Sequence, residues 1–222
     1  MSISDNLETI RSEIPQGVRL VAVSKFHPVA QLAEAYAAGQ RIFGESRVQE
    51  LAAKIPQLPA DIRWHFIGHL QTNKVRALLS TRAVALIESV DSIRLLDAID
   101  AESERLGIVT RVLLQVHVAR EETKFGFLPE EIADYFAGRN YERLKATHIC
   151  GLMAMASNTD DEDRVRSDFR LAATLMQSVK ATTPDIRDFD ILSMGMSDDW
   201  HIAVSEGSNM IRIGTAIFGV RE

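Results

Sequence analysis

The sequence is short of three features, and each shortage excludes a class of protein. Its 222 residues include a single cysteine, Cys150, so the chain can form neither an internal disulfide nor a cysteine-rich metal site. No apolar run approaches the roughly 18 residues of a membrane-spanning helix. The first turns carry Asp5, Glu8 and Glu13 and have no apolar centre, unlike a secretory signal peptide. We therefore expect a cytoplasmic protein that stays out of the membrane.

Positive charge is also scarce. Lys and Arg number 25 against 31 Asp and Glu, which gives a net charge of −6, and the basic residues are scattered along the chain. A nucleic-acid-binding surface is therefore not expected. Nor do we expect a metal site. His65 falls in a predicted strand and His69 past its end, so this pair lacks the helical spacing that places two histidines on one ion.

The apolar residues that are present form short runs separated by helical patterns. Predicted strands cover residues 19–24, 41–43, 63–67, 84–88, 112–118, 148–152, 189–194 and 210–213. An apolar stripe over residues 3–14 predicts an additional helix before the first strand, and Asp91 and Thr159 are candidate caps of two later helices. The alternation favours one domain over residues 1–222, a (β/α)8 TIM barrel with an extra N-terminal helix. An open doubly wound sheet is the alternative.

Lys25 is the first candidate functional residue, because it ends the apolar run Leu20–Ser24. An ammonium removed from water needs a partner, or its pKa falls and it becomes a nucleophilic amine that can form a Schiff base with a carbonyl compound. The alternative is a lysine whose side chain extends out of the strand and keeps its ammonium group in water. In a barrel, the carboxyl ends of the strands gather the functional groups, and Lys25 lies at such an end.

The last two strand ends suggest a phosphate site. Gly195, Met196 and Ser197 follow the seventh predicted strand, and Gly214 and Thr215 follow the eighth. Barrels often bind phosphate at these two loops, where glycines expose backbone N–H groups and hydroxyls add donors. The alternative is that the glycines only form tight turns and that Ser197 only caps a helix. The coincidence of both loops favours phosphate.

Arg212 lies inside the apolar strand at residues 210–213, and alternation places it on the same face as Met210 and Gly214. A buried arginine requires a partner, which is either a carboxylate such as Glu88 or Asp91, or a phosphate or heteroaromatic ligand. A phosphorylated aldehyde bound as a Schiff base on Lys25 would use the lysine, the phosphate loops and the arginine together. Pyridoxal 5′-phosphate and a sugar-phosphate substrate of an aldolase are two such ligands.

Six motifs spread from residue 20 to residue 219 resemble one known family, the pyridoxal phosphate homeostasis proteins. They are LVAVSK (20–25), FGESRVQE (43–50), WHFIGHLQTNK (64–74), GLM (151–153), LSMGMSDD (192–199) and GSNMIRIGTAIFG (207–219). This family is similar to the N-terminal barrel of alanine racemase without that enzyme's second domain. The resemblance therefore implies the same barrel fold.

The resemblance also implies a role for individual residues. Pyridoxal phosphate would be held as a Schiff base on Lys25, with Arg212 facing the pyridine nitrogen. The phosphate would be held by Ser197, Gly214 and Thr215, and the ring would be surrounded by Ser46, His65 and Met153. Lys124 falls where the family tends to have a lysine near the mouth. The chain departs from the family pattern at Ser46-Arg47 (usually Asn-Tyr), His69 (proline) and His117 (asparagine).

The implied function is buffering or delivery of the cofactor, without strong catalytic activity, and PLP-dependent acceptor enzymes would be its partners. An arginine at the pyridine nitrogen weakens the ring as an electron sink, because guanidinium does not release a proton readily. A racemase also needs a second base, and Tyr36, Tyr135 and Tyr141 all fall on predicted helices or loops away from the rim. The alternatives are a pyridoxal phosphate-dependent racemase or lyase and a Schiff-base aldolase. A monomer is favoured, because the domain through which racemases pair is absent.

Overall fold

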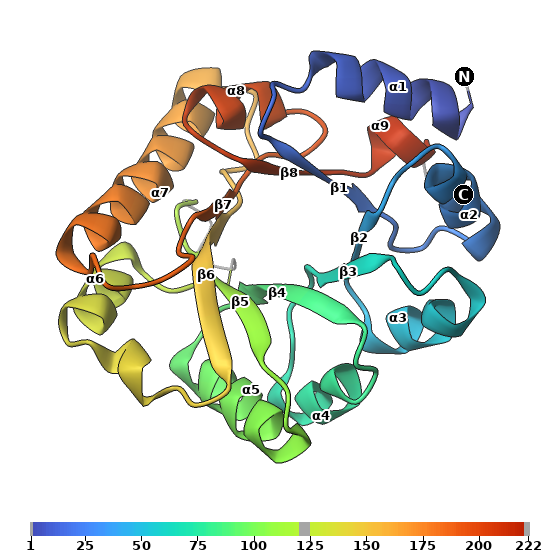
Figure 1. Cartoon of the computed structure of the whole chain (residues 1–222). Coiled ribbons are helices and arrows are strands. Elements are labelled where there is room, and N and C mark those ends of the chain that lie inside the picture. Colours follow the sequence, from blue (N-terminus) through green and yellow to red (C-terminus); the bar gives the residue numbers. More distant parts are fainter. Residues whose placement is uncertain (1, 120–124, 220–222) are drawn as a thin grey trace.

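The structure of the chain, a computed structural model, describes residues 2–119 and 125–219 and forms a closed barrel (Figure 1). Eight parallel strands follow one another in sequence order around the barrel, and the last pairs with the first. Helices surround the strands on the outside (Figure 1). The predicted (β/α)8 barrel is therefore confirmed, and the closure between β8 and β1 rules out the open doubly wound sheet.

Each predicted strand is present. The strands are β1 Arg19–Val23, β2 Ile42–Glu45, β3 Arg63–Phe66, β4 Val84–Val90, β5 Thr110–Val116, β6 Thr147–Ala154, β7 Ile191–Ser193 and β8 Met210–Ile213. The helices are α1 Ile3–Glu13, α2 Val29–Ala37, α3 Val48–Lys54, α4 Val75–Leu79, α5 Ile93–Leu106, α6 Pro129–Ala137, α7 Glu162–Thr182, α8 Trp200–Ser205 and α9 Thr215–Phe218. Short 3₁₀ turns cover Ile55–Gln57 (η1), Thr72–Lys74 (η2) and Asn140–Arg143 (η3).

The predicted N-terminal helix is α1, and it lies beside α2 and α9 in the outer ring (Figure 1). Ser2 caps it through a capping box with Asp5, and Ile3, Leu7 and Ile10 are its buried residues. The side chain of Asn6 donates a hydrogen bond of 2.9 Å to the carbonyl of Ile217 in α9. The helix therefore ties the start of the chain to the element that follows the last strand.

Two predicted helix caps are wrong by one or two residues. Ser92, and not Asp91, caps α5 by accepting a hydrogen bond from the N–H of Leu95, because the Asp91 carboxylate is bonded to His69. Asp161, and not Thr159, caps α7 by accepting from two backbone N–H groups of its first turn. In both cases a neighbouring oxygen of equal capping ability stands closer to the helix start.

The barrel interior is apolar in its middle and polar toward the carboxyl ends of the strands. The apolar part consists of Val21, Leu86, Leu113, Cys150, Met153, Ile191 and Met210. A larger apolar cluster packs the helices onto the outer face of the strands. No helix in the described part of the chain is both long and apolar enough to cross a membrane.

Strand β6 contains a bulge that brings an additional side chain inward. Its pairing with β5 advances from Ile149 to Leu152 while β5 advances only from Val112 to Leu114. Gly151 occupies the irregularity with φ of +147°, and a Cβ there would lie 1.9 Å from the carbonyl oxygen of Ile191. Only glycine fits this close approach. The extra residue places both Cys150 and Met153 in the interior.

Candidate functional site

Strand register brings the predicted site residues to one end of the barrel. Val21 pairs with Arg212 across β1 and β8, and a Cβ on Gly214 would lie 3.3 Å from the carbonyl oxygen of Val23. Lys25 and the loop after β8 are therefore neighbours at the carboxyl ends of these strands. Similar pairings place Ser46 after β2, His65 in β3, Met153 in β6 and the Gly195–Ser197 loop after β7 at the same end.

Lys25 is half-buried, and it directly follows Ser24, whose backbone and side chain are both hydrogen-bonded. The backbone N–H of Ser24 bonds to the carbonyl of Gly44, and its hydroxyl donates to Glu45 Oε1 at 2.6 Å. Lys54 Nζ lies 2.8 Å from the Ser24 carbonyl oxygen and 2.7 Å from Glu45 Oε1. The end of β1 is thus fixed by a buried ion pair, and this sets where Lys25 leaves the strand.

The same ion pair extends to the residue after Lys25. Glu50 Oε1 accepts hydrogen bonds from Lys54 Nζ at 2.7 Å and from the backbone N–H of Phe26 at 2.6 Å. Phe26 has φ of +68°, in the left-handed region that non-glycine residues seldom adopt. The Glu50 carboxylate therefore stabilises a strained turn immediately after Lys25. This clamp is not predicted from the sequence, although the i,i+4 spacing of Glu50 and Lys54 is a usable signal.

Glu45 is fully buried, and its Oε2 has no hydrogen-bond partner among the described residues. Burial raises the pKa of the Glu45 carboxyl, and the hydrogen bonds from Lys54 and Ser24 oppose that change. A buried carboxylate with one unpaired oxygen depends strongly on its remaining partners. Lys54, itself buried, is the only residue that gives Glu45 a charged partner in the described structure.

Arg212 is 4% exposed and belongs to a buried polar network. Its Nη1 donates to the backbone oxygen and hydroxyl of Ser193 at 2.9 and 2.7 Å, and its Nη2 donates to the carbonyl of Ala154 at 3.1 Å. Glu88 Oε2 lies 3.9 Å from Nη1, so Glu88 is the charge partner, whereas Asp91 bonds to His69 instead. Guanidinium carries five N–H donors, and these three bonds leave two for a ligand.

His65 and Glu88 complete this network. His65 Nδ1 lies 2.6 Å from Glu88 Oε1, and the Ser193 hydroxyl donates to Glu88 Oε2 at 2.6 Å. Burial alone would raise the pKa of Glu88, but its contacts with His65, Arg212 and Ser193 outweigh burial and lower it. The carboxylate therefore stays ionised beside Arg212. Because Nδ1 of His65 is engaged, its Nε2 is the ring nitrogen available to the mouth of the barrel.

The loop after β7 makes a sharp turn at a glycine. Gly195 has φ of +95°, and a Cβ there would lie 2.8 Å from Cα of Trp200, so a side chain is excluded. The N–H of Met196 donates to Asp199 Oδ1 at 2.6 Å, which folds the loop back against the start of α8. The hydroxyls of Ser197 and Thr215 form no hydrogen bond with any described residue, so both remain available as donors.

The remaining predicted residues take different positions at this end. Met153 is 1% exposed in the interior, whereas Met196 is 40% exposed at the rim. Ser46 lines a cavity of about 360 Å³ beside the mouth, together with Arg47, His69 and Lys74. Lys124 lies outside the described residues. Within residues 2–119 and 125–219 no group of three metal-ligating side chains is found.

The whole chain, residues 1–222, matches a family model described as "Alanine racemase, N-terminal domain". It is also similar to curated proteins called "Pyridoxal phosphate homeostasis protein". The protein from Schizosaccharomyces pombe is 36% identical, and the match covers 99% of this chain and 93% of that protein. The protein from Helicobacter pylori strain J99 is 39% identical over 90% of this chain and 87% of that protein.

The fold of this chain is also similar to solved structures. PipY of Synechococcus elongatus, solved with PLP bound, has a TM-score of 0.88 and 37% identity, covering 98% of this chain and 100% of that one. Alanine racemase from Corynebacterium glutamicum has a TM-score of 0.75 and 15% identity, and the match covers 99% of this chain and 61% of the racemase. The racemase likeness shows the fold alone, because the identity is low.

Proposed function

Because the chain belongs to the alanine racemase N-terminal domain family and, within it, to the pyridoxal phosphate homeostasis proteins, we propose that it holds pyridoxal 5′-phosphate as a Schiff base on Lys25 and buffers or delivers this cofactor. The observation that carries the proposal is the grouping of Lys25, two hydroxyl-bearing loops and a buried arginine at one mouth of the barrel. A protein 37% identical over its whole length has been solved with PLP bound.

The donor set at this mouth fits the cofactor. Ser197 and Thr215 would hold its phosphate with hydroxyl and backbone donors, and Gly195, Met196 and Gly214 would shape the two loops. Arg212 would face the pyridine nitrogen with its remaining N–H donors. The ring would be surrounded by Ser46, His65 and Met153. When bound, pyridoxal phosphate supplies an aldehyde that condenses with an amine and a ring that can withdraw electrons.

The residues of this chain favour holding the cofactor over using it. Arg212 is kept charged by Glu88 and does not give up a proton, so a ring nitrogen that it contacts stays unprotonated. None of the three tyrosines of the sequence lies at the mouth. Tyr36 in α2 bonds to Asp61, Tyr135 lies in α6, and Tyr141 in η3 contacts Asp185. This supports a carrier over a racemase or lyase.

The partners of such a carrier are enzymes that use pyridoxal phosphate, and we propose that the protein acts as a monomer. The clamp formed by Lys54, Glu45 and Glu50 fixes the backbone on both sides of Lys25. A lysine whose flanking backbone is fixed in this way is held in one place for capture and release of an aldehyde.

The test is an absorption spectrum of the purified protein between 300 and 500 nm, before and after borohydride, with Lys25→Ala in parallel. We expect a visible band that borohydride removes and that the variant lacks. A wild type that stays colourless after incubation with pyridoxal phosphate would point to the sugar-phosphate aldolase. Rapid turnover of amino acids by the loaded protein would contradict the carrier and favour a racemase or lyase.

A further inference from the structure

Three arginines stand at the opposite end of the barrel, at the start of β1, β3 and β5. Val21 and Leu113 line the interior, and His65 reaches Glu88 there. Side chains two residues apart on a strand share a face, so Arg19, Arg63 and Arg111 also face inward, one layer below these three. In an eight-stranded barrel one layer is contributed by alternate strands. Three of the four odd-numbered strands therefore place an arginine in the lowest layer.

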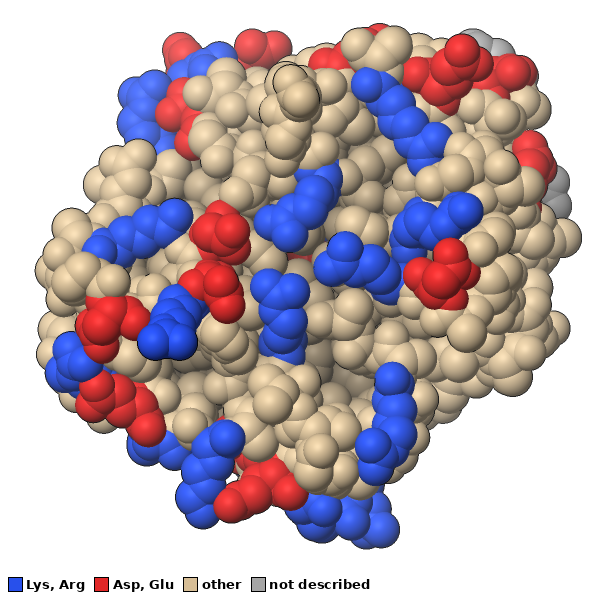
Figure 2. All heavy atoms as spheres, in the orientation of Figure 1, with Lys and Arg blue, Asp and Glu red and all other residues tan. Residues whose placement is uncertain are grey.

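These arginines are near enough to influence one another. Burial lowers the pKa of Arg19, Asp190 raises it, and the charges of Arg111 and Arg63 lower it further. Arg19 and Arg111 are half-buried, and Arg63 is exposed. Figure 2 shows Lys and Arg side chains around the hollow at the middle of this face, with Asp and Glu side chains on one side of them, over the region that the strands enclose in Figure 1.

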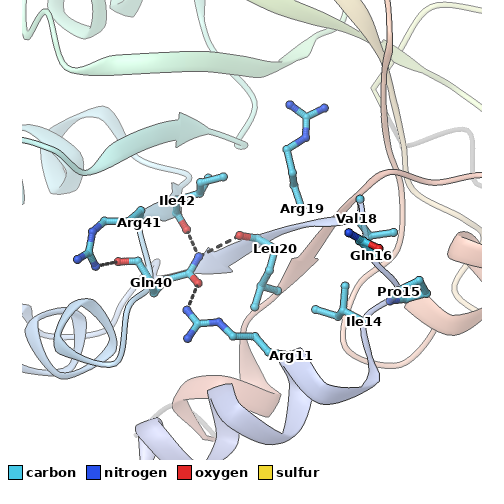
Figure 3. A pocket seen from close by; sticks show the side chains of 11 residues that line it. Arg11, Ile14, Pro15, Gln16, Val18, Arg19, Leu20, Gln40, Arg41 and Ile42 are labelled. Atoms are coloured by element: carbon cyan, nitrogen blue, oxygen red, sulfur yellow. Dashed lines mark hydrogen bonds between the residues drawn. The ribbon is translucent and has the colours of Figure 1, made fainter.

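The three guanidinium groups have few partners in the described structure. Arg111 Nε donates to the sulfur of Cys150 at 3.1 Å. The guanidinium groups of Arg19 and Arg63 form no hydrogen bond or ion pair with any described residue. In Figure 3, Arg19 extends away from the bonded pair Arg11 and Gln40, and no hydrogen bond joins its guanidinium to the other residues drawn. Among the acidic residues, Asp190 raises the pKa of Arg19 most, but the two side chains are not within ion-pair distance of each other.

A concentration of like charge is unexpected on a protein whose net charge is −6. Guanidinium groups close together repel one another unless an anion lies between them, and their planar donor forks match phosphate oxygens. The layer above is apolar, with Leu86, Cys150 and Met210. The adjoining cavity in Figure 3, about 390 Å³, is lined by Arg11, Arg19 and Arg41 and by no acidic residue. A ligand between Arg19, Arg63 and Arg111 would meet guanidinium donors on its sides and this apolar layer above it.

We propose that the amino-terminal mouth of the barrel, around Arg19, Arg63 and Arg111, binds a small phosphate-bearing anion. We call this site the lower mouth and the opposite end of the barrel, where Lys25 lies, the upper mouth. The apolar interior separates the two mouths. The proposal is independent of the proposed cofactor function. Two phosphate sites, one at each mouth, must therefore be told apart by experiment.

The test is isothermal titration calorimetry of the full-length protein with sodium pyrophosphate at low ionic strength. The test variant is the double substitution Arg19→Gln and Arg63→Gln. One control is Arg94→Gln, which removes an exposed arginine of α5, and the other is Ser197→Ala with Thr215→Ala at the upper mouth. We expect the lower-mouth variant to bind pyrophosphate about tenfold more weakly or not at all, because charge-assisted hydrogen bonds are lost. The Arg94 and upper-mouth variants should retain the lower-mouth binding event.

Thermal unfolding separates a lost site from a lost fold. In phosphate-free buffer the lower-mouth variant should melt at the same temperature as the wild type or higher, because repulsion between the arginines is relieved. Pyrophosphate should raise the melting temperature of the wild type and not of this variant. Binding that survives Arg19→Gln with Arg63→Gln, or that disappears only in the upper-mouth variant, would overturn the proposal.

Discussion

Arg212 illustrates how a single buried charge depends on its neighbours. Replacing Arg212 with Met removes the donor that contacts Ser193 and the charge that balances Glu88. We expect a loss of about 3–5 kcal/mol in the free energy of unfolding, because the Glu88 carboxylate remains buried without the guanidinium charge. Urea unfolding followed by circular dichroism measures this. Arg94→Gln, at an exposed position, should leave the unfolding midpoint unchanged, and equal midpoints for the two variants would contradict the role assigned to Arg212.

The buried carboxylate of Glu88 gives the stability a predictable pH dependence. Its pKa is lowered in the folded protein, so its contribution is fully present above the unfolded pKa of about 4.3 and is lost as the pH falls through the folded pKa. We expect the stability difference between wild type and Glu88→Gln to be largest near neutral pH and to shrink below about pH 4. Urea unfolding of both proteins across this range is the measurement. A stability difference between wild type and Glu88→Gln that grows toward acid pH would contradict this prediction.

The stability of the protein is also expected to depend on the buried ion pair of Lys54 and Glu45. Lys54→Met leaves Glu45 buried without a charged partner, and the expected loss is about 3–5 kcal/mol. Adding Glu45→Gln to Lys54→Met should recover much of the loss, since the unpaired charge is then gone. The exposed pair Lys145 and Glu104 is the matched control, and Lys145→Met should change stability little. A double variant no more stable than Lys54→Met would show that the charge is not the cause.

Candidate functional residues are recognisable in the sequence where they interrupt an apolar pattern. Lys25 and Arg212 stand out because a strand of apolar residues surrounds each of them. Lys54 does not stand out, since a lysine in a helix is usually a surface residue, and only the fold shows that it points inward. The choice between Glu88 and Asp91 as the partner of Arg212 also required the barrel, because it depends on distances between strands far apart in the sequence.

At the scale of elements, the bulge in β6 gives the sharpest prediction. Gly151→Ala places a Cβ 1.9 Å from the Ile191 carbonyl oxygen at a φ of +147°, so β6 and β7 must separate. We expect a loss of at least about 3 kcal/mol or failure to fold. Gly107→Ala is the control, because Gly107 also has a positive φ but open space around it, and a loss near 1 kcal/mol is expected there. Urea unfolding compares the two, and similar losses would mean that the close approach is unimportant.

The strands were predictable as elements, but their irregularities were not. Short apolar runs are typical of buried parallel strands, and all eight were found in this way. The sequence ended β6 at Leu152, two residues before its actual end at Ala154, because the pattern does not reveal that Gly151 adds a residue to the pairing. Helix caps failed for a related reason, since Asp91 and Ser92 are both good caps and a tertiary contact with His69 decides between them.

At the scale of the whole molecule, the barrel has two polar mouths separated by an apolar interior. The upper mouth has hydroxyls, a lysine and an arginine paired with Glu88, and the lower mouth has three arginines, of which Arg19 is influenced by Asp190 and Glu88 without an ion pair to either. Motif spacing located the upper mouth, because functional loops follow strands. The lower mouth is invisible in the sequence, where Arg19, Arg63 and Arg111 look like scattered surface charges until strand order gathers them into one layer.

The surface of the molecule bears on its oligomeric state. Of the large apolar residues exposed within the described chain, Ile93, Val109 and Leu171 lie apart from one another, whereas Phe26, Phe125, Leu128 and Met196 lie in the loops that follow β1, β5 and β7. Four side chains in these loops do not supply the wide apolar face that an obligate dimer buries. We therefore expect a monomer of 24.7 kDa with a radius of gyration of about 17 Å. Small-angle X-ray scattering with multi-angle light scattering measures both, and a doubled mass that persists on dilution would contradict the monomer. A monomer leaves both ends of the barrel uncovered by a second copy of the chain, which favours delivery of a cofactor to another protein.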